Sequence, residues 1–172
     1  MELTPVFTFS APGPSGKILS FLMQHQQQDQ WCWSATSVSV NLFFQRSGKW
    51  QQCTLVNNAF KQSTCCNDGS SSKCNQQWLL DKALKIVGNF SAARSRRAQF
   101  NEVTQQIDSS RPLCLRIQWS TGGGHFVAIY GYSGTVVNIG DPWWGDSVMD
   151  FQSFPSKYQT GGDWTHSYWV VP

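Results

Sequence analysis

The sequence predicts an α+β fold in which a helical N-terminal half precedes an antiparallel β-sheet. Two observations lead to this prediction. Apolar residues recur near helical spacing in the segment 76–87. After Pro112, short runs rich in β-branched and aromatic residues alternate with turn residues. Because 172 residues match the ordinary size of one domain, we expect a single domain over residues 1–172, with its helical half at about 20–110 and its sheet half at about 111–172.

The N-terminal half contains one ambiguous element. The stretch 31–45 lacks proline and glycine, as a helix would, but its alternating serine and valine residues suit a strand as well by periodicity. Before it, residues 6–9 are compatible with a short edge strand and residues 12–16 with a turn. After it, helices are expected at residues 55–61, 76–87 and 100–107.

The C-terminal half is predicted to be a series of strands. Gly131 and Gly134 mark a turn between an apolar run that begins at His125 and another that ends at Ile139. This pattern is typical of two adjacent antiparallel strands. The expected strands are residues 113–119, 125–132, 136–139, 147–151 and 167–171.

Cys32 and His125 are the residues best suited to nucleophilic catalysis. A thiol is mostly protonated at neutral pH, so a nucleophilic cysteine needs a nearby base or a positive field. In a helix, Cys32 would occupy the first turn, where unpaired backbone N–H groups favour an anion. His125 follows the glycines 122–124, which allow close backbone approach. Taken singly, each residue is also compatible with a structural role, as a small buried cysteine or a hydrogen-bonded histidine.

Asp141 is the candidate for the group that orients the imidazole. The ring nitrogen that does not face sulfur must donate its proton to an acceptor. Asp141 follows the apolar run 135–139 and precedes Pro142, which places it at the end of the strand next to that of His125. A turn-capping carboxylate is the alternative role. His166 is a minor alternative base in case the last strand lines the cleft.

A tetrahedral oxyanion requires hydrogen-bond donors close to the nucleophile. The backbone N–H of Cys32 is one donor by its position. The segment 24–30 contains five glutamines, each of which offers a side-chain amide, and the residue types alone do not distinguish among them. A polar linker is the competing interpretation of this segment.

Together these residues carry a family resemblance. The pattern consists of Gln26, Cys32 followed by Trp33, the sequence Gly-Gly-His-Phe at 123–126, and Asp141 followed by proline. It resembles the papain-like cysteine proteases, and in particular the compact bacterial branch that includes the staphopains and a plant-pathogen type III effector protease. The similarity extends over about residues 20–170.

The resemblance implies a papain-like fold and a role for each residue. The stretch 31–45 would be the central helix that carries Cys32 as the nucleophile. His125 would be the base, Asp141 the orienting group and Gln26 the oxyanion donor. Two features depart from the plant and lysosomal members: the chain lacks their Cys-Gly-Ser-Cys-Trp signature, and it has an aspartate where they usually have an asparagine.

The implied activity is that of a cysteine endopeptidase, which hydrolyses a protein or peptide substrate through an acyl-enzyme intermediate. An effector deamidase or transglutaminase with the same triad is the main alternative, and an inactive binding module is a third. We expect no cofactor and no metal, a monomer, and secretion or delivery into a target cell as an effector. An inhibitor or immunity protein is a further candidate partner.

The remaining cysteines predict disulfides. Cys53, Cys65, Cys66 and Cys74 lie in one window, and vicinal cysteines rarely bridge each other, so Cys65 and Cys66 should each pair with a different partner. Both of the resulting pairings remain open. A zinc site is the alternative, but the window has no histidine and no two-residue spacing between cysteines. Disulfides imply an oxidising compartment, whereas Cys114, in an apolar run, is expected to be a buried free thiol.

Charge gives little indication of a polyanionic partner. Charged residues make up 13% of the chain and its net charge is +3, so we expect neither a nucleic acid nor a membrane as a partner. The basic cluster Arg94-Ser95-Arg96-Arg97 is expected to be a solvated loop, with an anionic partner as the less favoured alternative. Residues 1–5 lack the features of a signal peptide, so the exported form would be trimmed or cut from a larger effector.

Overall fold

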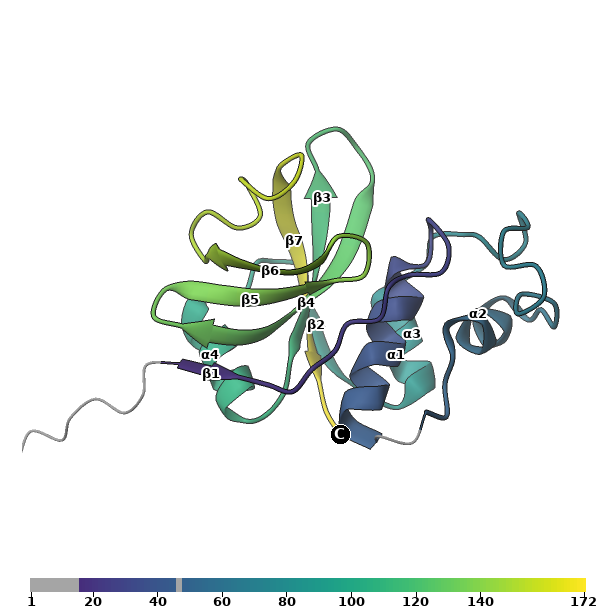
Figure 1. The fold of residues 1–172 in the computed structure, drawn as a ribbon, viewed down its shortest axis with the longest axis horizontal. Coiled ribbons are helices and arrows are strands. Elements are labelled where there is room, and N and C mark those ends of the chain that lie inside the picture. The colour runs from purple at the N-terminus through teal and green to yellow at the C-terminus, as the bar shows by residue number, and fades with distance from the viewer. Residues whose placement is uncertain (1–15, 46–47) are drawn as a thin grey trace, which may run out of the picture.

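Helices pack beside an antiparallel sheet in the computed structural model, which describes residues 16–45 and 48–172 (Figure 1). The predicted α+β class, with helices first and the sheet second, is confirmed. The predicted strand at residues 6–9 lies outside the described residues. Helices α1 (Cys32–Gln45), α2 (Gln52–Phe60) and α3 (Leu80–Val87) lie together on one side, and α4 (Phe100–Asp108) lies against the sheet.

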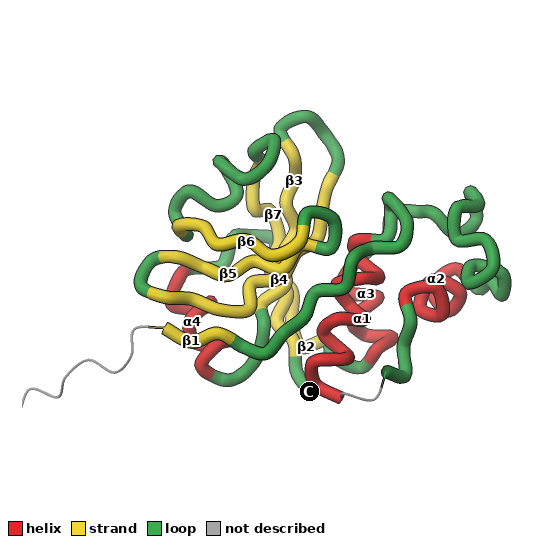
Figure 2. The backbone as a smooth tube through the Cα atoms, in the orientation of Figure 1, coloured by secondary structure: helices red, strands yellow, loops and turns green. Residues whose placement is uncertain are grey.

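The strands of the sheet pair in the order β2-β7-β3-β4-β5-β6, and β1 pairs with β4 outside this path (Figure 2). Every pair is antiparallel. The last strand therefore enters the sheet between β2 and β3 rather than at its edge. The strands are β1 (Gly16–Ile18), β2 (Phe90–Arg94), β3 (Leu113–Trp119), β4 (Gly124–Ser133), β5 (Val136–Asp141), β6 (Gly145–Asp150) and β7 (Gly162–Val170).

Helix α1 lies at the centre of the molecule, between the sheet and the helices α2 and α3. Its first ten residues, from Cys32 to Asn41, are all buried. Small side chains allow this close packing on every side, and their hydroxyls are satisfied internally: Ser37 Oγ donates to Trp33 O at 2.8 Å and Ser39 Oγ to Ala35 O at 2.7 Å. A helix that is buried all round has no amphipathic period, which explains why its serine and valine pattern was ambiguous.

Several element boundaries differ from those predicted. Helix α2 begins at Gln52 rather than at residue 55, because the Leu55 N–H donates to the carbonyl of the N-cap residue Gln51 at 3.0 Å and Thr54 Oγ1 accepts the Gln51 N–H. Helix α3 begins at Leu80, since the Gln76 carbonyl is engaged by the Trp33 indole instead. Strand β7 begins five residues earlier than predicted, at Gly162 rather than residue 167, where it pairs with the end of β3.

Two strands were not predicted. Residues 12–15 of the expected turn lie outside the described residues, and Gly16 begins β1, where a Cβ would lie 2.7 Å from Tyr132 O, so glycine permits the close approach to β4. Strand β2 has little β-branched character, and pairing with β7, distant in sequence, holds it. Within the described residues, no helix has both the length and the apolarity to cross a membrane.

The segment between α2 and α3 is cross-linked by two disulfides, Cys53–Cys66 and Cys65–Cys74. They confirm the prediction that the vicinal cysteines bond to different partners, and Cys114 is a buried free thiol as expected. The cross-linked segment contacts the start of α1, because Trp31 Nε1 donates to Cys74 O at 2.9 Å. The disulfides thereby order the backbone that the first turn of α1 packs against.

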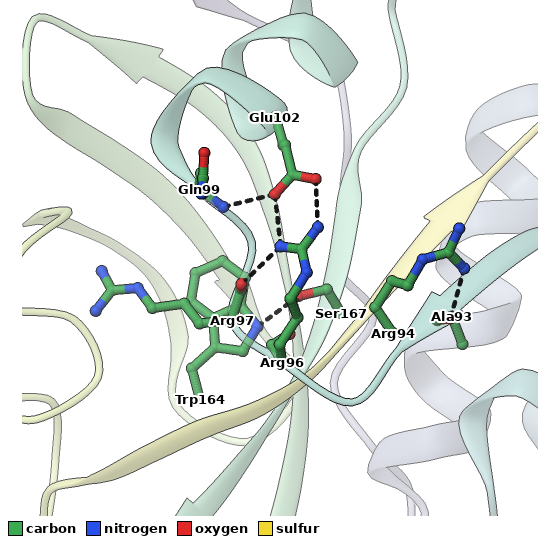
Figure 3. Close-up of polar contacts among 8 residues, drawn as sticks. All are labelled: Ala93, Arg94, Arg96, Arg97, Gln99, Glu102, Trp164 and Ser167. Carbon is green, nitrogen blue, oxygen red and sulfur yellow. Dashed lines mark hydrogen bonds and ion pairs between the residues drawn. The ribbon is translucent and has the colours of Figure 1, made fainter.

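The interpretation of Arg94 to Arg97 as a solvated loop was wrong in part. Arg94 is the last residue of β2, and Arg97 is half-buried. The Arg97 guanidinium lies 4.3 Å from the ring centroid of Phe151. It lies 5.5 Å from the ring centroid of Trp164, and Figure 3 shows both of these side chains. Aromatic faces attract a guanidinium and cover its hydrocarbon stem, so this arginine is part of the packing.

Candidate active site

Cys32 begins helix α1 at the edge of a cavity of about 350 Å³. Only 8% of the residue is exposed. His125, near the start of β4, lines the same cavity, and Cys32 is close enough to contribute to the raised pKa of the His125 imidazole. The nucleophile and base expected from the sequence are therefore brought together, one from the helices and one from the sheet.

The His125 imidazole is held by a hydrogen bond at Nε2 and by two aromatic rings. Nε2 lies 2.8 Å from Asp141 Oδ1. Trp119 stacks on the ring with centroids 5.8 Å apart, and Trp144 meets it edge-on at 5.4 Å. Burial lowers the pKa of His125, but the Asp141 carboxylate and the nearby Cys32 outweigh it and raise the pKa to about 9. These neighbours therefore favour the charged form of the imidazole.

Asp141 is the last residue of β5 and is 2% exposed. Besides the imidazole, its Oδ1 accepts the backbone N–H groups of Trp143 at 2.7 Å and Trp144 at 3.0 Å. Its Oδ2 accepts the hydroxyl of Tyr158 at 2.9 Å. These four hydrogen bonds compensate for the burial of the carboxylate. The contact with His125 is the one that the expected orienting role requires, and the two backbone contacts are those of the alternative capping role.

Sequence reasoning missed Tyr158 as a neighbour of the site. It lies on the connection between β6 and β7, 17 residues beyond Asp141, and no local pattern links the two. Burial and the nearby Asp141 charge raise the pKa of Tyr158, so its hydroxyl stays protonated and remains a donor. The Asp141 carboxylate is thus fixed from both oxygens.

Gln26 lies beside the site but does not direct its amide at it. The side chain is buried, and its Nε2 donates to Gln28 O at 2.8 Å and Asp29 O at 3.0 Å. Its Oε1 is buried and has no hydrogen-bond partner among the described residues. Gln26 nevertheless lines a hollow of about 240 Å³ that His125 also lines. Gln26 therefore lies near His125, as an oxyanion donor would, but its amide donates to two main-chain carbonyls instead of pointing a free N–H into the site.

The glutamine-rich segment is not a linker. The buried side chain of Gln52 ties it to α2, since Gln52 Nε2 donates to His25 O at 2.9 Å and its Oε1 accepts the Gln27 N–H at 3.0 Å. The Gln26 N–H donates to Pro142 O at 2.8 Å, which joins the segment to the end of β5. The segment therefore forms an ordered wall next to the catalytic candidates.

His166, the alternative base, also lines the 350 Å³ cavity. Its Nδ1 lies 3.0 Å from Thr165 Oγ1, and across residues 16–45 and 48–172 no carboxylate pairs with it. His125, unlike His166, has both the Cys32 thiol and the Asp141 carboxylate as neighbours. Over the same ranges, no three histidine, cysteine, aspartate or glutamate residues are grouped as metal ligands would be.

A helix that begins with a cysteine, packed against a sheet that supplies a carboxylate-bound histidine, is the arrangement of the papain-like cysteine proteases. Residues 17–159 match the family described as Papain-like cysteine protease AvrRpt2. The chain belongs to this family and is a cysteine protease. The resemblance stated from the sequence is thereby confirmed.

Solved structures with the same fold are distant in sequence. The peptidase domain of the Streptococcus transporter ComA is 15% identical, with a TM-score of 0.59 over 88% of this chain and 98% of that one. A putative C39-like peptidase from Bacillus anthracis is 16% identical, with a TM-score of 0.59 over 91% and 98%. A cysteine protease from Carica candamarcensis is 14% identical, with a TM-score of 0.60 over 92% and 98%. No curated protein sequence matches the chain.

Proposed function

We propose that this cysteine protease is an endopeptidase that cleaves a protein substrate through an acyl-enzyme intermediate, with Cys32, His125 and Asp141 as its triad. The observation that carries the proposal is the buried 2.8 Å contact between His125 Nε2 and Asp141 Oδ1. It leaves the other ring nitrogen for the Cys32 thiol, which lines the same cavity as His125. Each group then has the neighbour that its role requires.

In the proposed reaction, the Cys32 proton passes to His125, which gives a thiolate beside an imidazolium. The sulfur attacks the carbonyl carbon of the scissile peptide bond and forms a tetrahedral intermediate. His125 then donates its proton to the departing amine, and a thioester with Cys32 remains. A water molecule, deprotonated by His125, hydrolyses the thioester and restores the thiol. Asp141 holds the ring in place and stabilises its charged form throughout.

The space around His125 supports cleavage within a chain rather than at its end. Two hollows, of about 350 and 240 Å³, both include Gly124 and His125 in their walls. One extends along Trp78 and Tyr168, the other along Trp143 and Trp144. A substrate can therefore continue on both sides of the bond that is cut.

The proposed activity is tested with an unfolded protein such as casein. We expect new N-termini, detected by mass spectrometry, and complete inhibition by a thiol alkylator. A deamidase or transglutaminase with the same triad would instead release ammonia without cutting the chain. Ammonia release without any new N-terminus would therefore refute the endopeptidase and favour that alternative.

We propose that the oxyanion is stabilised by the first-turn N–H of Cys32 and by the Gln26 amide. Gln26 Nε2 carries two hydrogens, and loosening one of its contacts to the carbonyls of Gln28 and Asp29 frees a donor when substrate is bound. Such a donor strengthens its hydrogen bond in the transition state, so Gln26→Ala should reduce kcat by roughly a hundredfold or more with little change in KM. Gln27→Ala and Gln28→Ala are the controls and should be nearly silent; equal effects in all three would remove Gln26 from this role.

We also propose that the protein acts as a monomeric single domain and is secreted or delivered into a target cell as an effector. The two disulfides support export, because such bonds persist in oxidising compartments. Export is tested by expressing a tagged chain in its natural host and following it in the medium and in co-cultured target cells. A chain retained in the producing cytosol with all cysteines reduced would contradict it. An inhibitor or immunity protein remains a candidate partner.

A further inference from the structure

A third hollow, of about 330 Å³, lies on the opposite face of β7 from the active-site cavity. Tyr168 and Trp169 follow each other on this strand, so their side chains point to opposite faces. Tyr168 lines the active-site cavity, and Trp169 lines the third hollow. Polar side chains make up most of the remaining wall: Ser91, Arg94, Arg96, Glu102, Gln106 and Arg111.

The hollow carries an excess of positive charge. Arg96 is neutralised by Glu102 through two contacts of 2.7 Å, and this pairing lowers the pKa of Glu102 to about 2. Among the described residues, neither Arg94 nor Arg111 has a carboxylate within ion-pair distance. Three arginines and one glutamate leave a net charge of +2 around the hollow.

The arginines of the basic cluster have different surroundings (Figure 3). Arg96 extends to Glu102 on α4, while Arg97 turns away to the ring of Trp164. Arg94 lies on the other side, where its Nη1 donates to Ala93 O at 2.9 Å. Arg94 and Arg96 therefore border the hollow, whereas Arg97 belongs to the packing behind it.

We propose that this hollow binds a small phosphorylated molecule, whose phosphate oxygens are held by Arg94 and Arg111. Guanidinium groups match phosphate oxygens in geometry and charge, and two of them here lack an anionic partner. The volume falls within the range of small-molecule sites, from about 300 to 1,000 Å³. Arg96, fixed by Glu102, supplies further N–H groups at the same wall.

The site is concave and local, and this shape favours a small ligand over a membrane or nucleic acid. Those partners require an extended basic face, whereas the whole chain carries a net charge of only +3. The walls come from β2, β7 and α4, and Ser167 Oγ on β7 already donates to Arg96 O at 2.7 Å. A bound phosphate would connect the same elements and stabilise them against unfolding.

The proposal is tested by calorimetric titration of the complete chain with inorganic pyrophosphate at low ionic strength. We expect one molecule bound per chain and an increased melting temperature. Arg94→Gln/Arg111→Gln should weaken binding at least about tenfold. Lys73→Gln/Lys157→Gln removes the same charge from exposed positions outside the hollow and should leave the affinity within about twofold. Absence of one-to-one binding, or equal losses in both double variants, would overturn the proposal.

A substitution at the rim of the hollow and an anionic membrane surface provide two further tests. Ser91 is exposed at the rim, so Ser91→Glu should weaken pyrophosphate binding by repulsion without disturbing the packed interior. If Arg94→Gln/Arg111→Gln fails to fold, Ser91→Glu decides the question, and unchanged affinity there overturns the proposal. The protein should not sediment with vesicles of anionic phospholipid. If it sediments with the vesicles but does not bind pyrophosphate, its partner is a membrane surface and the small-ligand proposal is overturned.

Discussion

Replacing Cys32 by alanine is expected to abolish cleavage of casein while leaving the melting temperature almost unchanged. The Cys32 thiol is the free thiol that lines the same cavity as His125, so the variant has no nucleophile for acyl transfer. Loss of a nucleophile that acts as part of a triad typically costs about 100,000-fold or more in kcat. The measurement is the initial rate of peptide release by the purified variant.

Cys114→Ala is the matched control, because Cys114 is the other free cysteine. It is buried in β3, and burial raises the pKa of its thiol to about 12, so it is not a thiolate at neutral pH. We expect activity within about twofold of the unaltered protein, with a small loss of stability from the cavity. Substantial activity in Cys32→Ala, or its loss in Cys114→Ala, would show that the nucleophile has been misassigned.

Asp141→Ala is expected to reduce kcat by roughly 100- to 1,000-fold, less than removal of the nucleophile. It should also shift the alkaline limb of the kcat/KM profile to lower pH. Burial lowers the pKa of His125 and the Asp141 contact raises it, so without Asp141 the imidazolium is lost at lower pH. Asp163→Ala, which removes an exposed carboxylate, is the control. An unmoved limb, or a loss greater than in Cys32→Ala, would exclude the orienting role.

Asp141→Ala should also make the free energy of unfolding less dependent on pH. A folded-state pKa of about 9 for His125, above the usual 6.5, contributes stability that is fully present below pH 6.5. That contribution disappears as the pH rises through about 9. Unfolding free energies measured across this window should fall in the unaltered protein and change much less in Asp141→Ala.

Tyr158→Phe should shift the alkaline limb in the opposite direction. Without the hydroxyl, the Asp141 carboxylate loses a donor on Oδ2 and interacts more strongly with the imidazolium, so the pKa of His125 rises. We expect kcat to fall by about tenfold and stability by about 1–3 kcal/mol. Tyr132→Phe removes a comparable 2.9 Å hydrogen bond to Asp108 far from the site and should leave the profile unchanged.

The candidate triad could be predicted because each of its members depends on local signals. Cys32 begins a stretch without helix breakers, and His125 and Asp141 lie on adjacent strands joined by a short turn. Such nearest-neighbour pairing follows from the chain order alone. The helical state of α1 required the family resemblance, because complete burial removes the periodicity by which a helix is usually identified.

The features that could not be predicted depend on contacts between distant segments. Strand β2 is defined by its pairing with β7, and Tyr158 reaches Asp141 only through the path of the chain between β6 and β7. The orientation of the Gln26 amide is set by two main-chain carbonyls, which residue types do not reveal. Arg97 appeared solvated because the aromatic residues that cover it lie more than 50 positions further along the chain.

The cross-linked segment beside α1 gives the enzyme two opposing redox requirements. In the proposed mechanism Cys32 reacts only while its sulfur is reduced, whereas the oxidised Cys65–Cys74 bridge helps to hold the Cys74 carbonyl against the Trp31 indole. We therefore expect activity to fall at both ends of a range of reduction potential, at the oxidising end through loss of the thiol and at the reducing end through opening of the bridge. With the proposed export followed by entry into a reducing cytosol, the rate of bridge reduction would set the working lifetime of each molecule.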